Sequence, residues 1–546
     1  MLILNDSYSQ EINFDWNKIF GNTGNTSGLA IQSDKSGNIY ASGSFEGSIN
    51  YNGTIINSVG GKDGFLLKLD SAGNLIWSKH FSSNNDVNIN SLAIDKNNNL
   101  ILLGDYKVKV DFDLSLITNN ADTFYSSNMF ICKYSSNGNL LWAKNTGGRS
   151  FSGNSLTVDI NNDVIITGKS VDINYFDTLT AVKTLDSFLV TTPSGSLWEF
   201  YHPEMNFIAK YDNGGNKIWI KKSGGNSQKV ISDKGNNIIV TGNIYGNTYF
   251  DNVLVPGIGT ETSFLAHYSP NGDLHWVKTS GGSANWNCGY GLAIDTANNI
   301  YQSGQIFGNN IEFGGNIILP FAGIDAYLTK YDINGNLIWH QLIGTPTTME
   351  GKHNANCGKA LKIDNNGDIV LLGYFMDTLY CGIDTLKSNG AYDLMLLKYN
   401  SNGTILTSGQ FTDYGFIEGT DLSIGVNGEI YLTGLTTKNF WGSIYPSYAF
   451  IAKVANTIPT TPVGFNAIRN QNLMSIYPNP SNGLFNLNIG TAKSLKKIKI
   501  YSIEGKIIKE FTTNNASISF DIKDRGVYFV SVQIYDELGF CKVVVE

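Results

Sequence analysis

An apolar residue followed by a tryptophan twelve positions later recurs along this chain. Five copies keep the tryptophan, at the end of a phrase related to Gly-Asn-Leu-Ile-Trp, and a sixth copy ends in threonine. The pairs are Phe65 and Trp77, Phe130 and Trp142, Phe207 and Trp219, Phe264 and Trp276, Tyr327 and Trp339, and Met395 and Thr407. Such a recurrence predicts a repeat protein, in which each unit buries its apolar face against its neighbours.

A second phrase stands before each of these pairs. It consists of an apolar run, a turn rich in Asp, Asn and Gly, and a run of β-branched or apolar residues, which is the pattern of a β-hairpin. Its seven copies cover residues 29–43, 92–104, 156–168, 230–242, 292–304, 361–373 and 422–434. The pair that ends in tryptophan predicts a further hairpin, so each unit supplies four strands and almost no helix is expected.

The seventh unit has a third strand around Phe450 but no tryptophan strand after it. The N-terminal segment supplies the missing pattern, because Trp16, Lys18 and Gly21 have the spacing of later units. An N-terminal strand that completes the last sheet closes a ring and leaves no open sheet edge. We therefore expect an all-β chain in which residues 11–457 form a seven-bladed β-propeller closed by an N-terminal strand.

The two ends of the chain differ from this repeat. Residues 1–10 have too few apolar positions for a complete signal peptide, and we interpret them as the remnant of one. A Thr- and Pro-containing linker at 458–472 leads into residues 473–546. That last segment has short alternating strands with Gly turns, which predict a small C-terminal β-sandwich.

The charge of the chain argues against a nucleic-acid partner. The net charge is -8, and only three arginines occur among 546 residues. No run approaches the roughly 18 to 20 apolar residues of a membrane-spanning helix. We expect no nucleic-acid partner, no transmembrane helix and a monomer.

Five cysteines occur, without a Cys-x-x-Cys pair and without histidine at metal-ligand spacing. An odd number cannot pair completely within one chain. Cys288 and Cys357 stand in Asn-Cys-Gly at the same position of neighbouring units, which leaves a bridge between them conceivable. Buried, inert thiols are the favoured interpretation. We expect no metal and no cofactor.

The connections between hairpins vary in length, whereas the turns within hairpins are nearly constant. In a four-stranded meander the variable connections emerge on one face, where a binding site is expected. Aromatic rings stack on sugars and amides pair with hydroxyl or backbone groups, so such loops suit a glycan or a protein ligand. The candidate ligand-binding residues are Arg149, Trp286, Asn287, Glu350, His353 and Tyr414.

No catalytic residue is assigned, because no metalloprotease, serine-hydrolase, P-loop or dinucleotide motif occurs. The repeated tryptophans indicate packing between units rather than cofactor stacking, and His267 fills a position that is lysine in other units. The sequence favours a binding protein. Two alternatives stay open: an exported carbohydrate-active or quinoprotein-like enzyme that uses the propeller funnel, and a structural surface spacer.

The stretch at 61–79 reads Gly-Lys-Asp-Gly-Phe-Leu-Leu-Lys-Leu-Asp-Ser-Ala-Gly-Asn-Leu-Ile-Trp-Ser-Lys. It resembles the SBBP-type β-propeller repeat of secreted bacterial proteins, and the resemblance extends over nearly all of residues 11–457. This resemblance implies a propeller outside the cell but no common activity.

The C-terminal stretch carries Ser-Ile-Tyr-Pro-Asn-Pro at 475–480, Glu-Gly-Lys at 504–506 and a terminal Lys-Val-Val-Val-Glu. It resembles the type A (Por) sorting domain of type IX secretion cargo. This resemblance implies the type IX machinery as a partner, export across the outer membrane of a Gram-negative bacterium, and release or attachment at the surface. The sorting-signal positions that it implies are Tyr477, Pro478, Asn479, Pro480, Gly483, Gly505, Gly526, Val543 and Val544.

Overall fold

The computed structural model divides the chain into two compact units, Met1–Pro459 and Thr460–Glu546, which are described separately. The structure describes residues 11–21, 24–112, 115–118, 127–145, 152–170, 189–191, 197–199, 205–282, 286–308, 311–313, 316–318, 323–344, 355–381, 384–388, 392–412, 415–437, 446–455, 475–477, 481–489, 496–502, 507–534 and 537–545. Within these residues every regular element is a β-strand, so the expected all-β class is confirmed.

The sheets of the first unit repeat one antiparallel plan of four strands in sequence order. The first sheet contains β2 (Thr26–Ser33), β3 (Ile39–Phe45), β6 (Asp63–Leu69) and β7 (Leu75–Phe81), and the second contains β8 (Val87–Ile94), β9 (Leu100–Tyr106), β12 (Asn128–Tyr134) and β13 (Leu140–Asn145). The third sheet contains β14 (Ser152–Val158), β15 (Val164–Ser170), β18 (Met205–Tyr211) and β19 (Lys217–Ser223), and the fourth contains β20 (Asn226–Ser232), β21 (Ile238–Tyr245), β24 (Glu261–Tyr268) and β25 (Leu274–Gly281). The fifth sheet contains β26 (Cys288–Ile294), β27 (Ile300–Phe307), β30 (Ile324–Tyr331) and β31 (Leu337–Ile343), and the sixth contains β32 (Cys357–Ile363), β33 (Ile369–Phe375), β36 (Asp393–Tyr399) and β37 (Ile405–Phe411). The last sheet contains β38 (Phe416–Ile424), β39 (Ile430–Thr437), β40 (Ser447–Val454) and the N-terminal strand β1 (Phe14–Phe20).

Short hairpins lie in the connections between the second and third strands. They are β4 (Ser48–Tyr51) with β5 (Thr54–Asn57), β10 (Lys109–Phe112) with β11 (Ser115–Thr118), β16 (Leu189–Thr191) with β17 (Leu197–Glu199), β22 (Thr248–Phe250) with β23 (Val253–Val255), β28 (Ile311–Phe313) with β29 (Asn316–Ile318), and β34 (Thr378–Cys381) with β35 (Asp384–Lys387). In the hairpin of β28 and β29, strand β28 also pairs with β25 of the preceding sheet.

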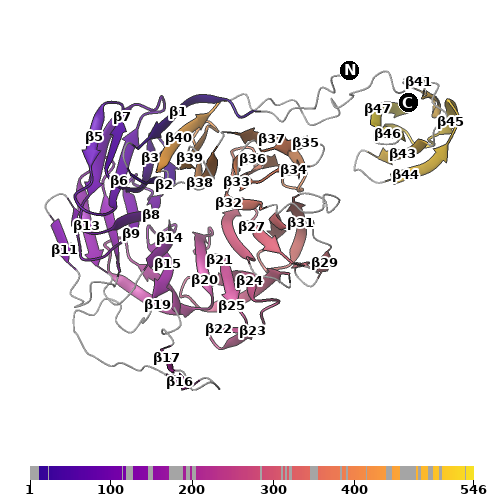
Figure 1. Cartoon of the computed structure of the whole chain (residues 1–546). Coiled ribbons are helices and arrows are strands. Elements are labelled where there is room, and N and C mark those ends of the chain that lie inside the picture. Colours follow the sequence, from indigo (N-terminus) through magenta and orange to yellow (C-terminus); the bar gives the residue numbers. More distant parts are fainter. Residues whose placement is uncertain are drawn as a thin grey trace. The chain divides into compact units, whose positions relative to one another are not determined.

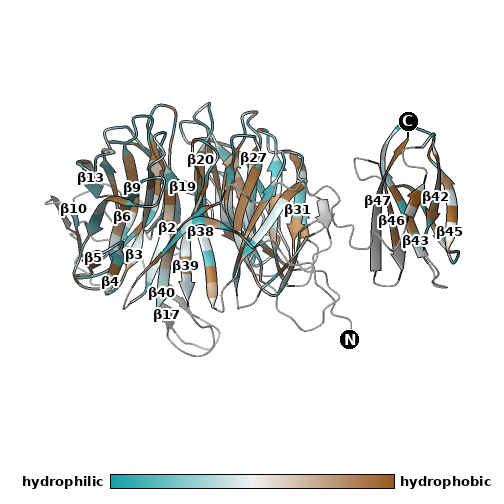
Figure 2. Ribbon diagram, turned by 90° about the horizontal axis from the view of Figure 1, so that it is seen from above, coloured by the Kyte–Doolittle hydropathy of each residue, from teal (hydrophilic) through white to brown (hydrophobic). Residues whose placement is uncertain are grey.

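The first strands of the sheets pack against one another around a common centre (Figure 1). They follow in the order β2, β8, β14, β20, β26, β32 and β38, and β38 packs in turn against β2. In the last sheet the outer strand is β1, which pairs antiparallel with β40, so that Phe20 lies opposite Ala449. In Figure 2 apolar residues, coloured brown, are concentrated along the strands, and polar residues predominate in the connecting loops.

Each repeated tryptophan contacts the next sheet as well as its own, where for example Trp77 lies near Tyr40 and Trp276 stacks on His267. Its ring lies against a turn glycine of the next sheet, and its indole N–H donates to a carbonyl oxygen of the same turn at 3.0 to 3.4 Å. The pairs of ring and glycine are Trp16 and Gly73, Trp77 and Gly138, Trp142 and Gly215, Trp219 and Gly272, Trp276 and Gly335, and Trp339 and Gly403. The tryptophans therefore join neighbouring sheets, in line with the expected packing role.

Thr407 replaces the sixth tryptophan for a structural reason. The sheet that follows it has β40 and β1 as its last two strands, and these come from opposite ends of the chain. No continuous turn with a glycine links them, because Ala455 reaches Asn13 only through an N–H to carbonyl hydrogen bond of 2.8 Å. A tryptophan at position 407 would lack the turn on which the other rings rest.

A glycine recurs in the second strand of every sheet, beside the first strand. A Cβ on Gly304 would lie 1.9 Å from the carbonyl oxygen of Cys288, a distance that no carbon atom tolerates. The equivalent glycines meet a first-strand carbonyl oxygen at 1.9 to 2.3 Å, and they are Gly43, Gly104, Gly168, Gly242, Gly373 and Gly434. These are the glycines that end the second sequence phrase. The close approach of the first and second strands therefore explains why this position of the repeat is glycine.

Replacing Gly304 with alanine should lower the free energy of unfolding by about 1–3 kcal/mol, because the new methyl group must push two paired strands apart. Urea unfolding measures the change. Gly281→Ala is a matched control, since a Cβ at Gly281 meets its nearest atom at an ordinary 3.6 Å. Equal effects of both substitutions would contradict this explanation of the repeated glycine.

The Asp-rich turns are held by their own chain. Asp159, for example, accepts hydrogen bonds from the backbone N–H groups of Asn161 and Asp163, and its other oxygen lies 2.8 Å from Lys210. His267 takes the place of this lysine in its sheet, and burial together with His275 lowers its pKa to about 4. Among the described residues no His, Cys, Asp and Glu group suited to a metal ion is found.

Cys288 and Cys357 are buried thiols that are not joined by a disulfide. Burial raises the pKa of Cys357 to about 12 and raises that of Cys288 still further. Both groups are therefore protonated and unreactive near neutral pH. In the described part of the chain, no helix is long and apolar enough to cross a membrane.

The second unit contains two antiparallel sheets. One consists of β41 (Ser475–Tyr477), β42 (Leu484–Asn488) and β45 (Ser517–Asp521), and the other of β43 (Lys496–Ser502), β44 (Ile507–Thr513), β46 (Gly526–Ile534) and β47 (Glu537–Val545). Phe485, Ile498 and Val530 are fully buried in a core shared by both sheets.

The sorting-signal positions fall into different places in this unit. Val543 is fully buried, the carbonyl of Val544 accepts a hydrogen bond from the N–H of Ser481, and Gly483 has a φ of 108° that favours glycine. Tyr477 is exposed, and Gly526 begins β46. Pro478, Asn479, Pro480 and Gly505 lie outside the described residues.

Candidate functional site

A β-bulge occurs at the same position in the first strand of every sheet of the first unit. A bulge adds one residue opposite its partner strand and redirects the side chain of that residue. The bulge residues are Leu29, Asn90, Asn154, Gln228, Tyr290, Lys359 and Thr420. The first strands pack against one another around a common centre, and each bulge residue lies in the first half or at the middle of its strand.

Three bulge side chains tie one sheet to the next. Asn90 donates to the carbonyl of Gly153 at 2.8 Å, and Asn154 donates to the carbonyl of Ser227 at 2.7 Å. Thr420 donates in the same way to the carbonyl of Gly28 at 2.8 Å. This repeated contact is structural, and Tyr290 and Lys359 depart from it.

Lys359 lies between aromatic rings and a carboxylate. Its amine is 2.9 Å from Glu418, 4.5 Å from the centre of the Tyr290 ring and 5.6 Å from that of Tyr374. Burial opposes the charge, but the neighbouring Cys357 and the ion pair with Glu418 raise the pKa of Lys359 above its usual value. The amine therefore stays charged near neutral pH, with part of each side chain still exposed.

The aromatic surface continues beyond Tyr374. Tyr374 packs edge-on against Tyr392, with ring centres 5.1 Å apart, and Tyr392 packs edge-on against Phe416 at the same distance. All three rings are partly exposed. We call Tyr290, Lys359, Tyr374, Tyr392, Phe416 and Glu418 the mouth cluster. It combines apolar ring faces with one cation and one anion.

Of the two sequence-predicted site residues that the structure describes, Trp286 is exposed. Its side chain is 54% exposed, its φ is 70°, and its ring centre lies 6.1 Å from that of Phe307. Its backbone N–H donates to a Glu261 carboxylate oxygen at 2.7 Å. A left-handed backbone held by the partly buried Glu261 presents this indole to solvent.

Asn287 has a different place from the one expected for a ligand contact. The side chain is fully buried, its amide nitrogen donates to the carbonyl of Glu261 at 2.8 Å, and its oxygen accepts from the N–H of Phe307 at 2.7 Å. It therefore positions the segment that carries Trp286. Arg149, Glu350, His353 and Tyr414 lie outside the described residues.

Two carboxyl groups near this end have raised pKa values. Burial raises the pKa of Glu261 although Trp286 and Asn243 donate hydrogen bonds to it. Burial likewise raises the pKa of Asp105, which accepts from Asn90 and from another asparagine amide. Both acids are fully engaged by amide donors of their own chain.

The sequence itself marks two residues of the mouth cluster, within the regular strands and not in the long loops. The bulge residue stands two positions before the first leucine-like residue of the central strand core, and in most units it is small, apolar or an amide. Only in two adjacent units is it an aromatic or a cation, Tyr290 before Leu292 and Lys359 before Leu361. An unusual residue type at this repeated position therefore marks two of the units that form the cluster.

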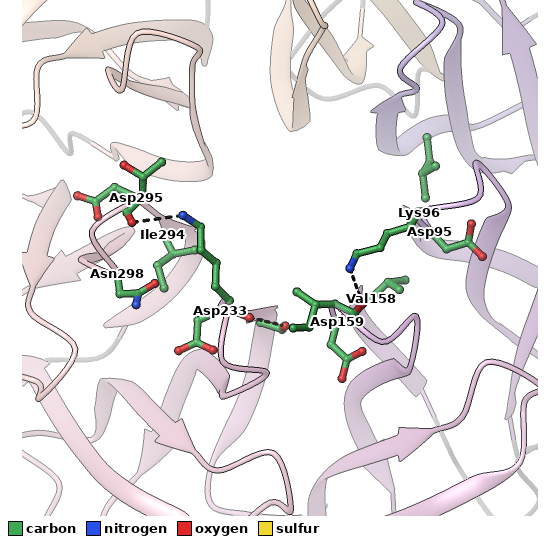
Figure 3. Close-up of a pocket in the computed structure, with 13 residues that line it drawn as sticks. Asp95, Lys96, Val158, Asp159, Asp233, Ile294, Asp295 and Asn298 are labelled. Atoms are coloured by element: carbon green, nitrogen blue, oxygen red, sulfur yellow. Dashed lines mark hydrogen bonds between the residues drawn. The ribbon is translucent and has the colours of Figure 1, made fainter.

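The opposite end of the ring, where the tight turns lie, holds a cavity of about 280 Å³ (Figure 3). Ile94, Val158 and Ile294 supply apolar lining. The lysines bind neighbouring backbone instead of a free acid, since Lys96 donates to the carbonyl of Ile160 and Lys234 to that of Thr296. This cavity therefore has few polar groups left for catalysis.

The second unit identifies the route of export. Residues 475–546 match the family described as the secretion system C-terminal sorting domain. The chain carries a type IX sorting domain. Such a domain marks proteins that Gram-negative Bacteroidetes export through the type IX secretion system, so the chain is a cell-surface or secreted protein whose partners include that machinery.

Two curated proteins are similar to part of the chain. An uncharacterised WD repeat-containing protein of Acanthamoeba polyphaga mimivirus is 25% identical over 49% of the chain and 23% of its own length. Regulatory protein FlaEY of Caulobacter vibrioides is 23% identical over 53% of the chain and 30% of its own length. The chain thus spans under a third of each relative.

Two solved structures are distantly similar to the chain. A fungal alcohol oxidase of the AA5 family in complex with copper has a TM-score of 0.40 at 10% identity, covering 98% of this chain and 99% of its own. PorZ, an essential surface component of the type IX secretion system of Porphyromonas gingivalis, has a TM-score of 0.20 at 10% identity, covering 97% and 99%. Neither likeness bears on the function of this chain.

Proposed function

We propose that residues 11–457 form a seven-bladed β-propeller of the SBBP type, closed by β1. The repeated four-stranded sheet supports this proposal, as does the pairing of β1 with β40 in the last sheet. The packing of β38 against β2 adds to it, with the N–H of Ile31 donating to Asp421 at 3.1 Å across the seam. A ring joined in this way leaves no open sheet edge between its ends.

This propeller serves as an exported binding module with no chemistry of its own, and a glycan is the ligand that the mouth cluster fits best. The single supporting observation is the contact of Lys359 with Glu418 and with the faces of two tyrosines. Partly exposed rings stack on the apolar faces of sugars, while the charged pair offers a donor and an acceptor to hydroxyl groups. Trp286 adds an exposed indole on the variable loops.

The test is a glycan array and a surface-protein pull-down with the full chain. Lys359→Met and Tyr290→Ala should each weaken binding at least tenfold, because each removes a ring or a charge at the centre of the cluster. Tyr249→Ala is the matched control, since this tyrosine is 64% exposed on a hairpin of another sheet. Binding of a protein instead of a glycan would change the proposed class of ligand but would leave the proposed site unchanged.

Equal binding by the wild type and both cluster variants would remove the site assignment. Absence of any ligand would favour the spacer alternative. The enzyme alternative would require Asp105 or Glu261 to exchange an amide partner for the substrate, because both acids accept hydrogen bonds from amide groups of their own chain. Turnover of a bound glycan that is lost in Asp105→Asn, with binding retained, would favour that enzyme.

A further inference from the structure

A second cavity, of about 310 Å³, lies among the first strands toward the tight-turn end of the first unit. Its lining includes residues of β2, β8, β14, β20 and β32. Three lysines contribute to it, Lys35, Lys229 and Lys362, together with Asp34 and Asp95. This volume is at the lower limit of small-molecule sites, which suits one compact ligand.

The carboxylates of the two acids in this cavity already have hydrogen-bond or ion-pair partners within the chain. Asp34 accepts hydrogen bonds from the N–H of Ser36 at 2.8 Å, the N–H of Asn38 at 2.9 Å and the hydroxyl of Tyr40 at 3.1 Å. Asp95 forms an ion pair of 2.7 Å with a lysine of the third strand in its own sheet. Neither carboxylate is available to balance the cavity lysines.

The cavity amines have one further carboxylate to share. Lys229 lies 3.8 Å from Asp421, whose second oxygen already accepts from the N–H of Ile31 at 3.1 Å. The side-chain amine of Lys362 makes no hydrogen bond and no ion pair with any residue that the structure describes, although its main chain pairs with Val370 in the sheet. Its pKa is lowered by burial and by Lys229, and Asp421 only partly offsets this effect.

Lys229 and Lys362 thus line one cavity with a single carboxylate of the described residues near them, and like charges in a cavity repel each other unless a counter-ion is bound. A bound oxyanion would supply the missing acceptor, because charge-assisted hydrogen bonds from ammonium groups are among the strongest in proteins. We propose that this cavity binds a small oxyanion, a carboxylate or a sulfate, between Lys362 and Lys229. The site lies toward the other end of the ring from the mouth cluster, so it goes beyond the proposed function and does not depend on it.

Isothermal titration of the full chain with three probes tests the proposal. Inorganic sulfate represents a free oxyanion, glucuronate represents a carboxylate carried by a sugar, and glucose is the neutral control. Sulfate or glucuronate should bind to the wild type and glucose should not. Binding by glucuronate far above that by sulfate would assign the oxyanion to an acidic saccharide, and the reverse would assign it to a free ion.

Lys362→Met keeps the length of the side chain and removes its charge, so it should weaken binding of the oxyanion at least tenfold. Lys234→Met is the matched control, since the Lys234 amine bonds to a carbonyl outside this cavity, and it should bind like the wild type. The apo form of Lys362→Met should melt at the same temperature as the wild type or higher, because an unpaired amine is replaced by an apolar group.

Sulfate also stabilises most proteins by exclusion from their surface, so direct binding and not the melting temperature decides the result. Equal affinity in the wild type and Lys362→Met, or no binding of either oxyanion to the wild type, would overturn the proposal. If Lys362→Met fails to fold, Lys229→Met provides the same comparison with the same two decisive outcomes.

Discussion

Replacing Phe20 with alanine should lower the free energy of unfolding of the first unit by about 3–5 kcal/mol. Phe20 ends β1 and is 2% exposed. Its ring packs edge-on against Tyr51 at 5.4 Å and against Phe65 at 5.5 Å, and both of these residues belong to the first sheet or its hairpin. The substitution therefore leaves a cavity where the last sheet meets the first.

Urea unfolding followed by tryptophan fluorescence measures this loss. Ile19→Ala is the matched control, because Ile19 is the adjacent residue of β1 and is 56% exposed. The control should change the free energy of unfolding by no more than about 0.5 kcal/mol. If both variants unfold at the same urea concentration as the wild type, β1 does not contribute to the closure that we propose.

Removing residues 475–546 should eliminate the chain from the cell surface and from the culture medium. The sorting domain occupies these residues, and the type IX machinery selects its cargo through it. Immunoblots of surface, medium and whole-cell fractions from a Bacteroidetes host measure the distribution. The truncated chain should remain inside the cell, while its first unit keeps the strands that form its own core.

A point substitution tests whether export requires the sorting domain to be folded or only to be present. Val543→Asp places a carboxylate in a fully buried position of this unit and should block export as completely as the truncation. Ile508→Asp is the control, since Ile508 is 44% exposed, and it should be exported normally. Normal export of Val543→Asp would show that the folded core of this unit is not what the machinery selects.

The repeat could be predicted from the sequence because its marker residues have local causes. The spacing of Phe65 and Trp77 reports two paired strands and a turn, and the structure adds that Trp77 rests on the turn that contains Gly138 in the next sheet. The loss of this pattern at Thr407 could be observed in the sequence but not explained there. Its cause is the meeting of β40 and β1, which are far apart in the chain.

The candidate site was less accessible to sequence reasoning. Loop composition pointed to Trp286, which is exposed, and also to Asn287, whose amide holds backbone groups instead. Nothing local distinguishes these neighbours, since exposure depends on how the segment turns around Glu261. Tyr290 and Lys359 were overlooked because a bulge, and not the alternation of a regular strand, directs them to the centre.

The oxyanion cavity could not be predicted from the sequence at all. Lys229, Lys362 and Asp421 belong to three different repeats, and each stands in an ordinary strand. Their proximity is a result of the ring arrangement, which brings strands separated by long stretches of chain to one centre. Tertiary structure alone creates the imbalance of charge there.

The central claim is that the mouth cluster is where the exported chain holds its ligand. Hydrogen–deuterium exchange of the full chain, with and without the glycan selected on the array, tests it most directly. We predict slower exchange at the first residues of β26, β32 and β38, with no change in the tight turns at residues 95–98 and 159–162. Protection confined to those turns, or absent from all three strands, would contradict the account.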